Sequence, residues 1–156
     1  MNLSDTRLAL PRALIEGGLL SALQLESIIY AKLRHSILLP DGSRSGFLLG
    51  DGAGIGKGRQ IAGLIYEQFI RGQRRAIWFS ASADLCKDAE RDFGDIGAGK
   101  IPLCSLGKQG YGKLANSFPE GVLFCTYTCL ISGRNGKSGK KSRFDQVSPP
   151  PAPPLP

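Results

Sequence analysis

The sequence predicts an α/β protein in which helices cover a parallel sheet. Short apolar runs of strand length alternate with longer stretches whose apolar residues recur at a helical period, and a glycine-rich loop joins one run to the helix after it. This alternation is typical of right-handed βαβ units, which build parallel sheets. The 156 residues have room for about one domain of the usual size.

The first half of the chain predicts a helix, a turn, a strand and a second helix. Residues 14–33 carry apolar side chains near a helical period, although a glycine pair weakens the start of this helix. Turn formers gather at 38–43, and the apolar run at 46–51 suits a strand buried on both faces. Residues 57–73 predict an amphipathic helix that packs on the sheet. Its apolar stripe is Ile61, Leu64, Ile65 and Phe69, with Arg59, Gln60, Glu67 and Gln68 largely elsewhere.

The second half predicts three more strands and one helix. The apolar run at 76–80 is interpreted as a buried strand, after which Ser82 or Asp84 caps a charged helix that runs to about residue 93. Further strands are expected at 101–105 and 121–127.

No metal site is predicted. The four cysteines lack the spacing of a zinc knuckle, so we expect reduced and mostly buried thiols. Basic residues lie among the acidic residues of the charged helix, which favours a solvated face over a set of metal ligands. These acidic residues are Asp84, Asp88, Glu90 and Asp92.

The composition changes abruptly after residue 132. Glycine, serine and lysine dominate up to residue 143, and 148–156 is almost entirely proline. Such a segment has too little apolar surface to offset its ordering entropy, so we expect a folded unit at 1–132 and a disordered tail at 133–156. The proline-rich end predicts either a polyproline II helix that docks SH3 or WW domains or a plain linker.

The chain carries a formal charge of +7, but this charge is uneven. The tail holds five basic residues against one acidic residue, which leaves the first 132 residues only mildly basic. Charge alone therefore does not indicate that the folded part binds nucleic acid. No apolar stretch reaches the roughly 20 residues that cross a bilayer, and no signal peptide is recognisable, so we expect the cytosol or nucleus and no membrane partner.

The glycine-rich segment 50–58 is the most informative part of the sequence. A nucleotide phosphate is bound by converging backbone N–H groups, which require glycines that can adopt positive φ and approach the phosphate without a Cβ. The positive end of the following helix and one lysine add to the attraction. These features are supplied by Gly52, Gly54, Gly56 and Lys57.

The loop departs from the common phosphate-loop pattern G-x-x-x-x-G-K-[ST] at two positions. Asp51 stands where the first glycine is expected, and Gly58 stands where a serine or threonine would hold Mg²⁺. The alternative interpretation is a glycine-rich turn between a strand and a helix, with an incidental lysine.

Residues 50–59 resemble the D-E-x-G-x-G-K-[ST] loop of Snf2-like superfamily 2 helicases, and the Gly-Arg pair after the lysine resembles the strawberry notch proteins. Other segments between about residues 10 and 132 are similar to the same family in the same order. They are Trp78-Phe79-Ser80, Asp84-Leu85, the acidic helix at 88–92, Ser105-Leu106, Tyr111-Gly112-Lys113 and the strand at 121–127.

The resemblance implies a RecA-like ATPase lobe from a nuclear, helicase-like regulator of transcription, in a family linked to Notch signalling and to chromatin. ATP is the implied cofactor. The implied partners are transcription factors, chromatin components and nucleic acid. The implied location is the nucleus, with the cytoplasm as a second compartment.

The resemblance also implies roles for individual residues. Gly54, Gly56 and Lys57 would cradle the phosphates, and Gln24 would read the adenine edge. The alternative for Gln24 is a solvated residue on a helix surface.

Three further residues match positions where such motors contact the nucleic-acid backbone. Ser80 and Ser82 follow the second strand, and the alternative there is a helix cap. Thr126, with Tyr127 after it, matches another such segment, and a buried strand end is the alternative.

The family pattern contains parts that this sequence lacks. Phosphoryl transfer needs Mg²⁺ held with the help of an acidic residue, and this helicase group uses an Asp-Glu pair after a further apolar strand. No such run follows Tyr127, and the second lobe with its arginine finger is absent. We therefore expect nucleotide binding without meaningful ATPase or unwinding by this chain alone. The strand at 47–50 would have an unpaired edge, as expected of a truncated or alternatively spliced form.

Overall fold

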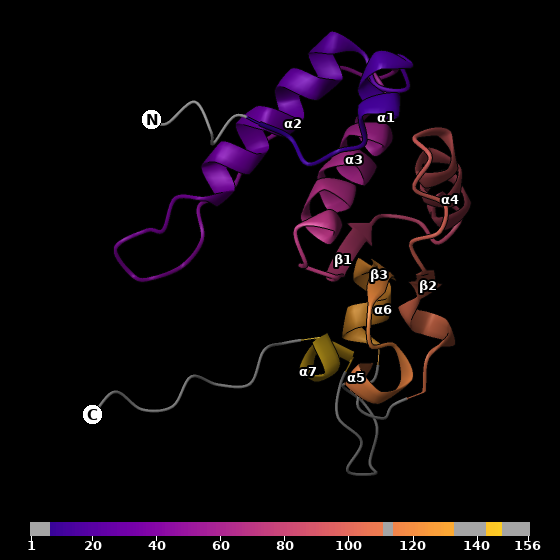
Figure 1. Ribbon diagram of the computed structural model, residues 1–156. Helices are drawn as coiled ribbons and strands as arrows, with labels where there is room; N and C mark the ends of the chain where they lie inside the picture. The colour runs from indigo at the N-terminus through magenta and orange to yellow at the C-terminus, as the bar shows by residue number, and fades with distance from the viewer. Residues whose placement is uncertain (1–6, 111–113, 133–142, 148–156) are drawn as a thin grey trace.

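The computed structural model describes residues 7–110, 114–132 and 143–147 of the chain. Three parallel strands form one sheet in the order β1-β3-β2, and helices lie around it (Figure 1). The elements are α1 (Arg12–Glu16), α2 (Ala22–His35), α3 (Lys57–Ile70), β1 (Arg75–Ser80), α4 (Leu85–Asp95), β2 (Leu103–Ser105), the short 3-10 helix η2 (Leu106–Lys108), α5 (Leu114–Ser117), β3 (Gly121–Thr126), α6 (Tyr127–Ile131) and α7 (Arg143–Val147).

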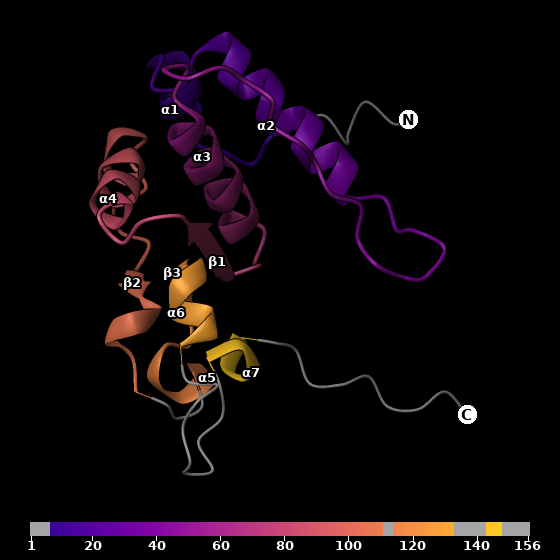
Figure 2. The same ribbon diagram turned by 180° about the vertical axis from the view of Figure 1, so that it is seen from behind.

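The predicted α/β class and parallel sheet are confirmed. β1 pairs with β3 from Arg75 opposite Gly121 to Ser80 opposite Thr126, and β2 pairs with the other edge of β3. Helices α3 and α4 pack against each other, as do α2 and α3, so α3 lies between the other two in both views (Figures 1 and 2). This arrangement fits a fragment of a RecA-like sheet.

The central strand β3 separates two apolar clusters because its side chains alternate between the faces of the sheet. Val122 belongs to the larger cluster, under α2, α3 and α4, whereas Leu123 and Cys125 belong to a smaller cluster beside α5, α6 and α7. Trp78 of β1 contacts Phe93 of α4 edge-on, with ring centres 6.2 Å apart. Full burial of each large apolar side chain contributes about 1.5–3 kcal/mol to folding, and β3 contributes buried side chains to both clusters.

The prediction of one helix at 14–33 is wrong, because the chain forms α1 and α2 with a break between them. Gly18 has a φ of 67°, a left-handed conformation that ends α1. Ser21 then begins α2 through a capping box, in which its hydroxyl accepts from the N–H of Gln24 and the Gln24 side chain accepts from the N–H of Ser21.

The predicted turn at 38–43 is confirmed, but the predicted strand at 46–51 is wrong. Leu38 bridges Arg44 across the turn. Residues 46–50 are extended without belonging to the sheet, and Leu48 is 89% exposed. An apolar segment becomes a strand only where another strand pairs with it, and the three described strands pair with one another.

Helix α3 confirms the predicted helix, and Leu64, Ile65 and Phe69 of the predicted stripe pack on the larger cluster, but two polar residues are buried more deeply. It ends at Ile70, because Gly72 adopts a φ of 93°. Glu67 and Gln60 are 0% and 2% exposed, whereas Ile61 is 37% exposed. The burial of Glu67 depends on its partners: its carboxylate accepts from the N–H groups of Ala9 and Leu10 and pairs with Arg71 at 2.6 Å.

Within the predicted tail, residues 143–147 form the short helix α7. Arg143 is 5% exposed and donates to the backbone oxygens of Gln109 and Gly110, and Val147 packs on the smaller cluster. The remaining tail residues, including the proline-rich 148–156 with its predicted SH3 or WW docking, lie outside the described residues.

The cysteines are less buried than predicted. Cys125 is buried, and burial raises the pKa of its thiol to about 12, whereas Cys86, Cys104 and Cys129 are half-buried. None of the described helices is long and apolar enough to cross a membrane.

Candidate functional site

The loop before α3 contains glycines at positive φ, as the sequence predicted for it. Gly54 and Gly56 adopt φ values of 86° and 80°, which L side chains rarely adopt. A Cβ on Gly52 or Gly54 would meet nothing within 4 Å, so the loop borders open space there. Gly56 begins α3 without a side-chain cap, so no side chain of the described residues occupies the first-turn N–H groups. These uncapped donors, at the positive end of a helix, fit an anionic ligand.

Lys57 folds back over this loop. Its ammonium donates to the backbone oxygens of Asp51 at 2.9 Å and Gly52 at 2.7 Å. The cation is therefore held within the loop by neutral carbonyls, which a phosphate can replace with stronger charge-assisted bonds.

Gln24 connects α2 to the loop. It is 7% exposed, its Oε1 accepts from Ser21, and its Nε2 donates to the backbone oxygen of Ile55 at 3.0 Å. A Cβ on Gly56 would lie 2.6 Å from that Nε2. The alternative of a solvated surface residue is therefore wrong, while the adenine role stays a prediction.

Asp51 anchors the loop to α3, a role that the sequence did not indicate. Its Oδ2 accepts from Nε2 of Gln60 at 2.9 Å, which fixes the amide orientation of that buried side chain. The other amide atom, Oε1 of Gln60, is buried and has no hydrogen-bond partner among the described residues.

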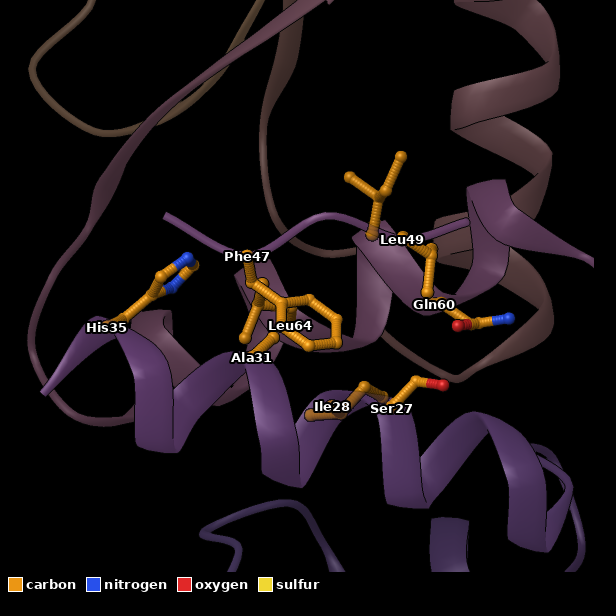
Figure 3. Close-up of a pocket in the computed structure, with 9 residues that line it drawn as sticks. Ser27, Ile28, Ala31, His35, Phe47, Leu49, Gln60 and Leu64 are labelled. Atoms are coloured by element: carbon orange, nitrogen blue, oxygen red, sulfur yellow. The ribbon is translucent and has the colours of Figure 1, made fainter. Parts of the chain in front are cut away.

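A small apolar cavity of about 110 Å³ lies between α2, α3 and the extended segment before the loop (Figure 3). Phe47 and Leu49 reach over the two helices there, and His35 lies at one end. Burial and the nearby Arg44 lower the pKa of His35, which favours a neutral imidazole. The cavity lining therefore contains no cationic group that would suit a triphosphate. The lining residues are Ser27, Ile28, Ala31, His35, Phe47, Leu49, Gln60, Ile61 and Leu64.

The three predicted nucleic-acid residues gather at the carboxyl ends of two strands. Ser80 and Thr126 are register partners at the ends of β1 and β3. Thr126 caps α6 by accepting from the N–H of Cys129 at 3.1 Å. Ser82 is exposed and accepts from the N–H of Asp84 at 3.4 Å, so it forms a local turn rather than a cap of α4. Their contact with nucleic acid stays a prediction.

Asp92 is a candidate that the sequence analysis assigned to a solvated helix face. It is half-buried, and its carboxylate lies so close to Gly58 that a Cβ there would overlap Oδ2. The sequence feature that could have indicated this contact is Gly58, because a glycine there, in place of the usual serine or threonine, leaves room for another side chain. Among the described residues, no group of three or more His, Cys, Asp or Glu side chains could hold a metal ion.

Comparisons with known proteins identify the family of the chain. The model of the family "P-loop containing NTP hydrolase pore-1" matches residues 2–149. The chain is 54% identical to protein strawberry notch of Drosophila melanogaster over 90% of its length, and 53% identical to human strawberry notch homolog 1 over 85%. It is 49% identical to protein FORGETTER 1 of Arabidopsis thaliana over 76%.

The matches cover only 9%, 10% and 10% of those three relatives, so the chain spans about a tenth of their length. No solved structure gives a significant match. Since the family model covers nearly the whole sequence, the chain belongs to the P-loop containing NTP hydrolase pore-1 family and is homologous to the strawberry notch proteins.

Proposed function

We propose that the loop at 52–58 binds the phosphates of ATP. The uncapped first turn of α3 carries this proposal, because its N–H groups end next to two glycines in left-handed conformations. Lys57 supplies the cation, and phosphate oxygens can replace its present carbonyl partners. Membership of a P-loop NTP hydrolase family supports the same ligand.

In this proposal the chain's own residues bind and orient the nucleotide. Gly52, Gly54 and Gly56 leave room for the phosphates, and Gly58 contributes a first-turn N–H. Gln24 lies beside the loop with its amide fixed by Ser21 and Ile55, where it can present its remaining hydrogen-bonding capacity to the adenine edge. Hydrolysis needs an acidic pair and an arginine finger in addition, and the sequence lacks the family pattern for both, so we propose binding without turnover by this chain alone.

We propose in addition that the chain is part of a nuclear regulator of transcription connected to Notch signalling, with chromatin components, transcription factors and nucleic acid as partners. Its similarity to proteins named strawberry notch supports this role. Fractionation of cells that express the tagged chain tests the location. Recovery of the chain from the cytoplasm alone would contradict it.

Calorimetric titration of the chain with ATP and Mg²⁺ tests the binding site. Lys57→Ala removes charge-assisted hydrogen bonds of about 1.5–3 kcal/mol, so we expect affinity to fall about 10- to 100-fold. Lys87→Ala, an exposed lysine on α4, is the matched control and should bind like the unmodified chain. Unchanged affinity in the Lys57 variant would show that the phosphates bind elsewhere.

A further inference from the structure

The carboxylate of Asp92 lies against the first turn of α3, beside the loop. α4 packs along α3 (Figures 1 and 2), and Arg59 of α3 pairs with Asp95 of α4 at 2.5 Å. A Cβ built on Gly58 would overlap Oδ2 of Asp92 and lie 3.2 Å from its Cγ. The carboxylate thus fills the space that a serine or threonine side chain would occupy at position 58.

This carboxylate has no cation of its own among the described residues. The two arginines whose charges reach Asp92 are paired elsewhere, Arg59 with Asp95 and Arg91 with Asp88. Partial burial raises the pKa of Asp92, against the opposing effect of these arginines. A half-buried carboxylate without a partner costs free energy, and a metal cation beside it would offset that cost.

The position of Asp92 raises an electrostatic conflict with the proposed ligand. Phosphate groups at the uncapped turn of α3 would lie near a second negative group, and the two repel unless a cation lies between them. Mg²⁺ in nucleotide sites is commonly held by phosphates together with one or two carboxylates, and a loop hydroxyl is its usual further ligand. Gly58 cannot supply that hydroxyl, whereas Asp92 places an oxygen in the same space.

Building on the proposed nucleotide site, we propose that Asp92 supplies a carboxylate oxygen to the Mg²⁺ of bound ATP, directly or through one water. It does so in place of the loop hydroxyl that Gly58 lacks. Gly58 and Asp92 then act together, because only a residue without a Cβ at position 58 leaves room for the carboxylate from α4.

The test measures the affinity of the full chain for ATP with Mg²⁺ and with EDTA. In the unmodified chain we expect Mg²⁺ to strengthen binding. Asp92→Asn keeps the size of the side chain but removes its charge, so the strengthening by Mg²⁺ should fall about tenfold while binding in EDTA is unchanged or tighter. Glu90→Gln, an exposed carboxylate on the same helix, should behave like the unmodified chain. Thermal unfolding without nucleotide checks that each variant folds.

A second pair of variants tests the exchange of ligands. Asp92→Ala should lose the effect of Mg²⁺, and adding Gly58→Ser to it should restore the effect, because the new hydroxyl then has room. Gly58→Ser alone meets the Asp92 carboxylate and should weaken binding.

The binding measurements distinguish failure of the nucleotide site from failure of the role proposed for Asp92. If the unmodified chain binds ATP in neither condition, the proposed function fails, and the role of Asp92 fails with it. If that chain binds but Asp92→Asn keeps the full effect of Mg²⁺, or loses affinity equally in EDTA, Asp92 has only a structural role and this proposal alone is overturned.

Discussion

Glu67 illustrates how single residues hold the helices around the site. Its carboxylate has no exposed surface, yet it accepts from the N–H groups of Ala9 and Leu10 and pairs with Arg71, with Lys32 at 3.9 Å. A buried charge of this kind is tolerated only when donors surround it. Glu67 therefore joins α3 to α2 and to the segment before α1.

We predict that Glu67→Ala lowers the free energy of unfolding by about 3–5 kcal/mol, because it removes the buried acceptor of the Ala9 and Leu10 N–H groups and the carboxylate that pairs with Arg71. Glu16→Ala, which breaks only the exposed pair with Arg12, should cost less than about 1 kcal/mol. Urea unfolding of the two variants measures the difference. Equal losses would contradict the role given to Glu67.

The sequence identified the glycines and the lysine of the loop, but it did not show which distant side chains would contact the loop. Gly54, Gly56 and Lys57 were identifiable because positive φ and a phosphate-reaching cation restrict the choice of residue. Asp51 and Asp92 were not assigned to the site, and Gln24 was assigned to it only through the family resemblance, since each acts through an element distant in sequence. No local pattern shows that α4 will lie against the first turn of α3.

At the scale of elements, three apolar runs that all predicted strands did not all form strands. The apolar runs at 76–80 and 121–127 became β1 and β3, whereas the run at 46–51 stayed outside the sheet. Their compositions do not separate them. Pairing decides: β3 has a strand on each side, while the segment at 46–50 instead covers α2 and α3 with Phe47 and Leu49.

Hydrogen exchange followed residue by residue measures this difference. We predict the slowest amide exchange in β3, because it is the central strand and residues 121–125 are buried. Amides at 46–50 should exchange almost as fast as in an unfolded chain. Protection at 46–50 equal to that of β3 would contradict the unpaired state of the segment.

At the scale of the whole molecule, the site is formed by few elements. The loop, α2, α3 and α4 carry every group invoked for the nucleotide, and the three helices meet in the larger apolar cluster. The sheet has three described strands, with β1 and β2 at its edges. Binding a ligand should therefore stabilise the fold as a unit, since the same packing holds both.

Thermal unfolding with and without Mg-ATP tests this account most directly. At a nucleotide concentration about 100 times the Kd, binding stabilises the folded state by about 2.7 kcal/mol, which raises the Tm of a chain of this size by about 5–10 °C. We predict one cooperative transition that shifts upward in the unmodified chain and shifts far less in Lys57→Ala. No shift in the unmodified chain, or an equal shift in both, would contradict nucleotide binding at this loop.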